Sequence, residues 1–316
     1  MKKSTGNPFA KFAPRKSNAA IKEQFRQEKK KAKKEREEYF EKKKASLRNP
    51  QAQPTAPTNS VPITEKMPLN KFIAHGGVAA RREAAELVKN GLVKVNGTVV
   101  NEPGYKVSPA DIVTVNGKKV LPQRSLVYIL MNKPKDYITT TDDPQKRRTV
   151  IDLLGKATKE RIYPVGRLDR NTTGVLLLTN DGDLAQQLTH PSHQIRKIYQ
   201  VTLDKPLEKN HFEQLAKGVV LDDGPATVDA IAYSDPKDKR QIGVEIHSGR
   251  NRIVRRLFEH VGYDVKNLDR VLFAGLTKKN VDRGKWRFLN EKEIRLLKHF
   301  GNNKKDEKRI TGPRRN

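Results

Sequence analysis

A short apolar run near the middle of the chain constrains the fold more than any other sequence feature. Residues 174–179 read Gly-Val-Leu-Leu-Leu-Thr, the most apolar of several strand-like runs. A short apolar segment bounded by turn residues predicts a buried β-strand. Further strand-like runs lie at residues 126–131, 199–203 and 243–247, and shorter helical stretches separate them without a regular βαβ repeat. This pattern predicts an α+β domain built on a largely antiparallel, mixed sheet.

The order of the segments predicts two folded units between basic ends. A Pro-rich stretch with Asn, Thr, Ser and Gln at residues 49–62 is typical of a linker, so folded sequence is expected to begin near Met67. Residues 21–44 mix Lys, Glu, Arg and Gln with few apolar side chains, which favours a helix without a face to bury. The predicted organisation is a basic, low-complexity extension, disordered or transiently helical, at residues 1–66, a small domain at 67–122, a larger domain at 123–300 and a basic tail at 301–316.

The composition and the absence of some motifs exclude several classes of chemistry. The 316-residue chain has no Cys, so disulfides and thiolate zinc sites are impossible. No apolar run approaches the roughly 20 residues that span a bilayer, and no hydrophobic signal segment follows the N-terminus, so we expect a soluble, cytoplasmic protein. The sequence has no Gly-rich phosphate loop followed by Lys-Ser/Thr, no Gly-x-Gly-x-x-Gly and no His-Glu-x-x-His. The absence of these motifs therefore disfavours an NTPase, a dehydrogenase or a zinc protease as the function of the chain.

The charge predicts a polyanionic partner. The chain has 65 Lys and Arg against 36 Asp and Glu, a formal net charge of +29. Residues 1–66 contain 18 basic and 7 acidic side chains and residues 301–316 contain 6 and 2, so +14 remains in residues 67–300. Basic tails alone fit a solubilising appendage as well as a binding segment, but a folded region this basic favours nucleic acid. A membrane surface is the second alternative, although residues 20–45 lack the apolar stripe that it requires.

The first folded unit is predicted to contain two helices followed by a β-hairpin. Apolar residues at helical spacing precede Gly76-Gly77, which suits a helix stop. A second helix is expected from about Ala80 to Asn90, and residues 92–100 read as a hairpin around an Asn-Gly turn. At about 50 residues the unit is small for a domain with a stable core of its own, so we expect it to rest on a neighbour or a ligand.

Three motifs in this unit resemble the S4-type RNA-binding domain, an αα-hairpin module whose second helix and hairpin face structured RNA. They lie at residues 69–74, 81–84 and 91–97. The likeness implies four phosphate contacts, although ordinary solvated helix charges are the alternative: Lys71, Arg81, Arg82 and Lys89. Ala80 stands where that family usually has a Ser that caps the helix. Its absence should cost roughly 0.5–2 kcal/mol unless another group takes over.

A dense polar loop directly precedes the apolar strand. Residues 166–174 read Gly-Arg-Leu-Asp-Arg-Asn-Thr-Thr-Gly. A carboxylate beside a buried strand needs a partner because its desolvation is costly, and the flanking arginines would hold Asp169 ionised by lowering its pKa. An ionised, positioned aspartate can be a nucleophile. Taken alone, however, an aspartate in such a setting is more often a turn-forming or capping residue.

The loop and its strand together resemble the signature of bacterial pseudouridine synthases of the RsuA/RluB family. The matching segment is residues 166–182, and the likeness extends over about residues 67–297 in the order S4-type module, then synthase domain. Supporting motifs are Leu-Met-Asn-Lys-Pro at 130–134, Lys-Ile-Tyr-Gln-Val at 197–201, Gly-Arg-Asn-Arg-Ile-Val-Arg-Arg-Leu-Phe at 249–258 and Gly-Lys-Trp-Arg-Phe-Leu at 284–289. In such enzymes a uridine within RNA becomes its carbon-linked isomer, and the resemblance implies no cofactor and no metal.

The resemblance assigns roles to three residues. It implies that Asp169 is the nucleophile, attacking either the ribose anomeric carbon or carbon 6 of the uracil. Tyr199 would stack on the uracil and could remove the proton from carbon 5, with a core aromatic as the alternative. Arg255 would pair with Asp169, whereas the alternative is a phosphate-binding helix face formed with Arg252 and Arg256. Ile253 departs from the family pattern, which often has Gln there, so any polar contact of that Gln is in doubt.

The target atoms lie within stacked RNA, so the resemblance also implies that the uridine is flipped out and held by a basic surface. The residues expected on the RNA-facing side of the larger domain are Lys133, Arg167, Arg170, Lys197, Arg250 and Arg252. The leading hypothesis is a pseudouridine synthase acting on ribosomal RNA, with the large subunit favoured by the RluB likeness and a monomer expected. The alternative is a non-catalytic RNA-binding or ribosome-assembly factor on the same fold.

Overall fold

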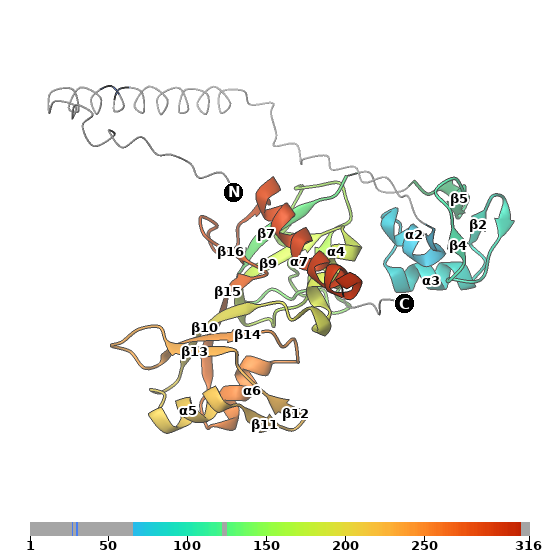
Figure 1. Ribbon diagram of the computed structural model, residues 1–316. Helices are drawn as coiled ribbons and strands as arrows, with labels where there is room; N and C mark the ends of the chain where they lie inside the picture. Colours follow the sequence, from blue (N-terminus) through green and yellow to red (C-terminus); the bar gives the residue numbers. More distant parts are fainter. Residues whose placement is uncertain (1–26, 28–29, 31–65, 122–124, 311–316) are drawn as a thin grey trace, which may run out of the picture. The chain divides into compact units, whose positions relative to one another are not determined.

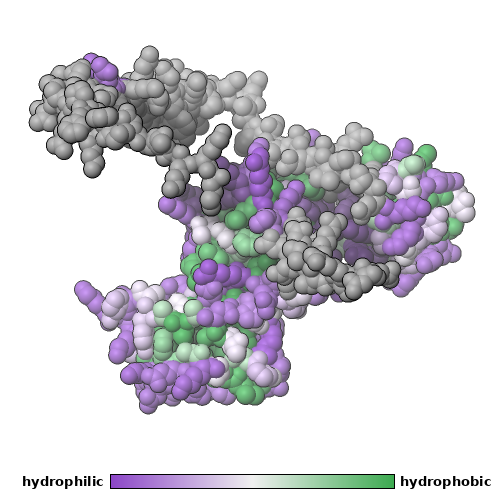
Figure 2. Space-filling view, viewed as in Figure 1, coloured by the Kyte–Doolittle hydropathy of each residue, from purple (hydrophilic) through white to green (hydrophobic). Residues whose placement is uncertain are grey.

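The computed structural model describes residues 27, 30, 66–121 and 125–310 of the chain (Figure 1). The expectations for residues 1–66 therefore fall almost wholly outside the described residues, and so does the end of the predicted basic tail. No helix among the described residues is both long enough and apolar enough to cross a membrane. Hydrophilic side chains cover much of the visible surface of the described parts (Figure 2), as expected for so charged a chain.

The small domain has the two helices and the hairpin that the sequence predicts. Its apolar core joins both helices to the inward-facing valines of a four-stranded sheet, in which β3, β2, β5 and β6 pair antiparallel in that order. Ala80 offers no side-chain cap to the second helix, but the Glu83 carboxylate accepts a hydrogen bond from the Ala80 backbone N–H at 3.1 Å. That contact supplies half of a capping box. The elements are β1 (Met67–Pro68), α2 (Leu69–His75), α3 (Arg81–Lys89), β2 (Val93–Val95), β3 (Thr98–Val99), β4 (Lys106–Val107), β5 (Val113–Val115) and β6 (Lys118–Lys119).

The large domain is built on one mixed sheet with the order β13-β14-β10-β15-β9-β7-β17 (Figure 1). Every neighbouring pair in this order is antiparallel except β9 and β15, which run parallel. The predicted α+β class and largely antiparallel sheet are confirmed. The strands are β7 (Tyr128–Lys133), β8 (Tyr163–Pro164), β9 (Thr172–Thr179), β10 (Lys197–Leu203), β11 (Val219–Leu221), β12 (Gly224–Ala226), β13 (Ala230–Tyr233), β14 (Gln241–Ile246), β15 (Val265–Phe273), β16 (Leu276–Thr277) and β17 (Trp286–Phe288).

The apolar run of β9 is buried on both of its faces. Val175 and Leu177 pack into one apolar cluster with α4 and α7, whereas Leu176 and Leu178 pack into a second cluster with β10, β14 and α6. A strand covered on both faces can be apolar at every position, which explains the absence of polar alternation. The helix α7 extends across the predicted domain boundary at residue 300. The helices are α4 (Gly182–Thr189), α5 (Lys209–Lys217), α6 (Ile253–His260) and α7 (Glu291–Ile310), with 3₁₀ turns η2 (Asp152–Leu154) and η3 (Pro191–His193).

Gly174 allows β9 to lie unusually close to β15. Its φ is +108°, a conformation that residues with a side chain rarely adopt, and a Cβ there would lie 2.1 Å from the Arg270 carbonyl oxygen and 2.7 Å from the Arg270 nitrogen. Both obstructing atoms are backbone and cannot rotate away. This close approach fixes the loop that precedes β9 against the parallel strand.

Replacing Gly174 by Ala should therefore lower the free energy of unfolding by at least about 2 kcal/mol, since backbone strain and a backbone clash combine. Urea unfolding followed by circular dichroism would measure it. Gly243→Ala is the matched control, because a Cβ on that strand glycine would make only ordinary contact at 3.8 Å. The control should change stability by less than about 1 kcal/mol. Equal effects for the two variants would contradict the close-approach explanation.

Candidate active site

A buried lysine holds the loop that carries Asp169. The Lys133 ammonium, at the end of β7, donates to the carbonyl oxygens of Asp169 at 3.0 Å, Arg170 at 3.1 Å and Thr172 at 2.8 Å. It also lies 3.2 Å from the carbonyl oxygen of Pro134. These carbonyls converge on one point because the loop turns sharply before it enters β9. The ammonium therefore determines where the Asp169 backbone sits.

The prediction that Lys133 contacts RNA is wrong in this structure. The residue is 0% exposed, does not line the cavity that Asp169 lines, and has four carbonyl oxygens around its ammonium, so no N–H is left for a phosphate. Burial lowers its pKa to about 8, while the carboxylates of Asp169 and Asp136 act in the opposite direction. A basic residue in a basic chain suggested a surface role, but the Lys133 ammonium instead adds a charged donor to loop carbonyls, two of which, those of Asp169 and Arg170, also accept a backbone N–H.

The Asp169 side chain is 36% exposed and faces a guanidinium from a distant part of the chain. Arg255, on α6, places its Nε 3.8 Å from Asp169 Oδ2, and its Nη1 donates to the Val265 carbonyl oxygen at 2.8 Å. Among the described residues, no backbone N–H donates to the Asp169 carboxylate, and its nearest hydroxyl is Thr172 Oγ1 at 3.5 Å. The carboxylate is thus not used as a helix cap or turn acceptor, which leaves it available for chemistry.

The three arginines of α6 and its start do not share one face. Arg255 is 9% exposed and lies against Asp169, whereas Arg256 makes a bidentate pair with Asp223 at 2.6 and 2.9 Å. Arg252 is exposed and lies 3.3 Å from Glu259. Burial, and then repulsion from Arg252, lower the pKa of the Arg255 guanidinium, although an arginine stays charged. This arrangement disfavours a single phosphate-binding helix face.

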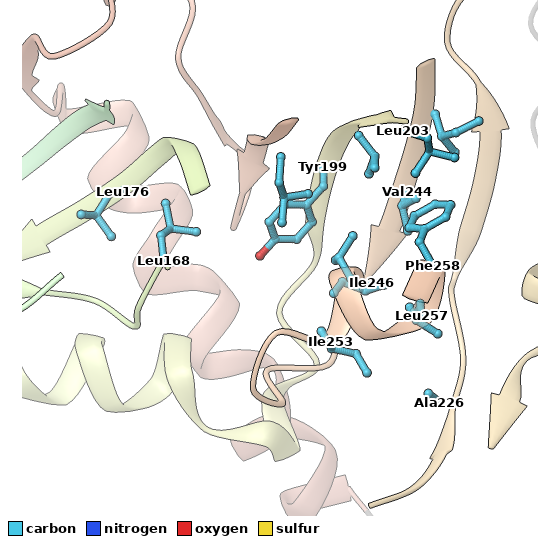
Figure 3. Close-up of a cluster of buried hydrophobic side chains, with 14 of the residues drawn as sticks. Leu168, Leu176, Tyr199, Leu203, Ala226, Val244, Ile246, Ile253, Leu257 and Phe258 are labelled. Carbon is cyan, nitrogen blue, oxygen red and sulfur yellow. The ribbon is translucent and has the colours of Figure 1, made fainter. Parts of the chain in front are cut away.

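Tyr199 stands at the boundary between the core and a cavity. The residue is 9% exposed, pairs with Val244 on one side and with Arg270 on the other, and belongs to the main apolar cluster. Figure 3 shows its ring among aliphatic side chains, with the hydroxyl directed toward the side where Leu168 lies. Because Tyr199 also lines the cavity, the core role and the proposed stacking role are compatible.

The cavity has a volume of about 300 Å³, and among the residues that the structure describes Asp169 is the one acidic side chain that lines it. A volume at the lower end of the range for small-ligand pockets suits one nucleotide. Gly166, Ser248 and Ile253 contribute to the wall, and Ile253 presents an apolar surface where the related family often has Gln. The cationic side chains that line the cavity are Arg167, Lys197, Arg250, Arg252 and Arg270.

The predicted basic contacts have different environments. Arg167 is exposed, and Arg170 is exposed with its guanidinium 3.1 Å from Asp136, so neither flanking arginine pairs with Asp169 as the sequence suggested. Arg250 donates to the carbonyl oxygens of residues 223–225 and thereby holds the β11–β12 turn. Lys197, at the start of β10, is half-buried. In the small domain, Lys71 is half-buried on α2, and Arg81, Arg82 and Lys89 are exposed on α3.

Sequence reasoning missed Arg270. It lies on β15 and is 2% exposed, yet it lines the cavity beside Tyr199. Strand alternation places Arg270 on the face of Leu268 but on the opposite face from Phe273, so the pattern gave conflicting signals for this charged residue.

The sequence matches two family models. Residues 127–260 match the RNA pseudouridylate synthase family, and residues 67–113 match the S4 domain. The first segment contains Asp169, Tyr199 and Arg255, whereas the part of the cavity wall on β15 lies beyond it; the second contains both helices of the small domain.

Similar proteins and a solved structure carry related names. A Bacillus subtilis protein named ribosomal large subunit pseudouridine synthase B is 41% identical over 241 residues, which cover 75% of this chain and 98% of that protein. An Aquifex aeolicus protein named uncharacterized RNA pseudouridine synthase is 40% identical over 232 residues, covering 72% and 92%. A crystal structure of pseudouridylate synthase is similar with a TM-score of 0.52 and 28% identity, covering 73% of this chain and 99% of that one.

The buried ammonium of Lys133 leads to a stability prediction. Lys133→Met keeps the side-chain length but removes the charged donor that four carbonyls share, of which those of Asp169 and Arg170 keep a backbone N–H donor, so the free energy of unfolding should fall by about 2–4 kcal/mol. Chemical denaturation measures this. The neighbouring Lys135 is exposed, and Lys135→Met should cost less than about 1 kcal/mol. A Lys133→Met protein as stable as that control would show that the loop does not need the ammonium.

Proposed function

Because the chain belongs to the RNA pseudouridylate synthase family and is a pseudouridine synthase, we propose that its substrate is a uridine in ribosomal RNA of the large subunit. The large-subunit assignment rests on the name of the Bacillus subtilis relative, which is matched over 98% of its length. The observation that carries the site assignment is the placement of Asp169 opposite Arg255 at the wall of a basic, nucleotide-sized cavity.

The reaction is an isomerisation in which one bond replaces another. The bond between the ribose anomeric carbon and nitrogen 1 of uracil breaks, a bond from the same carbon to carbon 5 forms, and the carbon 5 proton leaves. We propose that the Asp169 carboxylate is the nucleophile, bonding transiently either to the anomeric carbon or to carbon 6 of the base. Covalent capture keeps the detached base and the sugar together while the base rotates.

Arg255 and Tyr199 have supporting roles in this proposal. The Arg255 guanidinium, with two buried nitrogens that have no hydrogen-bond partner among the described residues, stabilises the Asp169 carboxylate as an anion and sets its direction. The Tyr199 ring offers a flat surface on which uracil can stack. Its hydroxyl is proposed as the general base that removes the carbon 5 proton.

RNA is proposed to reach the cavity by extrusion of one nucleotide. Unstacking costs a few kcal/mol, and the basic side chains around the cavity offset that cost through contacts with the backbone. The exposed Arg167, Arg170 and Arg252 are proposed to contact phosphates at the cavity entrance. Lys71, Arg81, Arg82 and Lys89 of the S4 domain are proposed to bind structured RNA next to the target.

We also propose separate roles for the segments of the chain. Residues 67–122 bind RNA, residues 123–300 carry out the isomerisation, and the basic segments 1–66 and 301–316 add affinity without sequence preference. The protein is proposed to act as a monomer in the cytoplasm, where ribosomal RNA is available. No step of this chemistry calls for a cofactor or a metal ion.

An Asp169→Asn protein should bind RNA with nearly unchanged affinity but lose all isomerisation, because an amide cannot form the covalent bond. Release of tritium from RNA labelled at carbon 5 of uridine measures turnover, and filter binding measures affinity. Asp238→Asn, which alters a half-buried carboxylate paired with Arg240 on the β13–β14 connection, outside the cavity, should keep full activity. Retained turnover in Asp169→Asn would remove Asp169 from the mechanism. Intact binding with no turnover in the wild-type protein would instead favour a non-catalytic RNA-binding factor.

Deletion of residues 1–60 tests the role of the basic N-terminal extension. Loss of its cations should weaken binding to long RNA and flatten the dependence of the binding constant on salt, because fewer counterions are released. Turnover on short RNA substrates should stay within about threefold of the full-length value, since the cavity is untouched. Affinity is measured across a salt series for both proteins. An unchanged salt slope would show that the extension makes no phosphate contacts.

A further inference from the structure

One wall of the cavity carries two cations that the proposed chemistry does not use. Lys197 on β10 and Arg270 on β15 both line it, together with Tyr199, which pairs directly with Arg270 across the two strands. Asp169 and Arg255 already form a pair, whereas no ion pair joins Lys197 or Arg270 to a carboxylate among the described residues. Neither cation is thus in direct contact with a carboxylate among the described residues, although the Asp229 carboxylate acts on Lys197 from a longer distance and Asp169 lines the same cavity.

Arg270 is the more deeply buried of the two. It is 2% exposed, its Nε donates to the Val175 carbonyl oxygen at 2.9 Å, and its guanidinium carbon lies 4.5 Å from the centre of the Phe273 ring. Its Nη2 is buried and has no hydrogen-bond partner among the described residues. A guanidinium held on two sides with an unused donor is prepared for a ligand that accepts hydrogen bonds.

Lys197 is half-buried and fixed at the cavity rim. Its Nζ donates to the His247 carbonyl oxygen at 2.6 Å and to the Ser248 carbonyl oxygen at 3.3 Å, which leaves one of three N–H groups free. Burial, and then repulsion from Arg270, lower the pKa of Lys197 to about 8. Lys197 pairs with Phe273 and Arg270 pairs with Tyr199 across the same two strands, and both cations line one cavity, so a single anion in that cavity can interact with both.

A local irregularity of the sheet places Arg270 at the wall. The pairing of β10 with β15 shifts between Ile198 and Tyr199, so one residue of β15 has no partner there. Because strand residues alternate between faces, Arg270 and Phe273 would otherwise face opposite sides, yet both line the cavity. Such bulges re-aim side chains and are common beside active sites.

We propose that Lys197 and Arg270 form a subsite for the phosphate group of the nucleotide that enters the cavity. A phosphate is favoured over a uracil carbonyl because two desolvated cations that form no direct ion pair among the described residues gain more from a full negative charge than from a neutral acceptor. The phosphate would fix the sugar on the β10–β15 wall and thereby set the position of the anomeric carbon and base relative to Asp169. The inference rests on the proposed function for the identity of the nucleotide, but its test does not depend on turnover.

Calorimetric titration of the full-length protein with uridine 5′-monophosphate and with uridine tests the proposal. The wild-type protein should bind the monophosphate about tenfold more tightly, since charge-assisted hydrogen bonds to phosphate are strong. In Arg270→Gln and in Lys197→Gln, this preference should fall below about threefold while the affinity for uridine stays within about twofold. Inorganic phosphate should weaken the binding of the monophosphate but not that of uridine.

Two further variants separate recognition from folding. Arg270→Lys keeps a cation and should retain part of the preference, and Arg240→Gln removes an exposed arginine paired with Asp238 and should retain all of it. Where Arg270→Gln is unfolded by circular dichroism, the half-buried Lys197 carries the test through Lys197→Gln.

The proposal has defined failing outcomes. An equal affinity of the wild-type protein for the two ligands overturns it, and so does an unchanged preference in a folded Lys197→Gln protein. A parallel loss of uridine and monophosphate affinity in Arg270→Gln would assign that residue to the base instead. Pseudouridine formation with no phosphate preference would leave the enzymatic function standing and remove only this subsite.

Discussion

The contact between the Lys133 ammonium and the carbonyl groups of the polar loop is the interaction on which the rest of the site depends. Backbone oxygens of Asp169, Arg170 and Thr172 point to the same atom, so the loop can turn sharply with its carbonyls satisfied. The side chain of Asp169 faces Arg255, whose Nε lies 3.8 Å from its Oδ2. A buried cation thereby places an anion at the cavity wall through the backbone instead of through a direct ion pair.

The parallel pairing of β9 and β15 converts this local geometry into a cavity. Gly174 lets the two strands lie close together, so the loop before β9 and the bulged part of β15 become opposite parts of one pocket. The helix α6 precedes β15 in the chain and places Arg255 next to Asp169. Residues separated by more than 80 positions in the sequence therefore meet at Asp169 because of one strand pairing.

The sequence predicted the elements well but not the environment of individual charges. The apolar run of β9, the two helices and hairpin of the small domain, and the α+β class all follow from patterns within a few residues. Lys133 was expected to contact RNA and is buried, and Arg270 was overlooked although it lines the cavity. Both depend on which strands become neighbours and on a bulge in β15, and neither property is encoded within a short window of sequence.

The two kinds of cation in the large domain make different contributions to binding. Exposed arginines such as Arg167 and Arg170, in the proposed function, act through long-range attraction, which salt screens, and would add affinity for any RNA. Arg270 and Lys197 are desolvated, and their interaction with an anion is screened far less and requires a defined position. If specificity for the flipped nucleotide arises in the cavity, its contribution should therefore persist at salt concentrations that abolish the contribution of the surface. The opposite result, with all binding lost in parallel as salt rises, would place recognition on the outer surface.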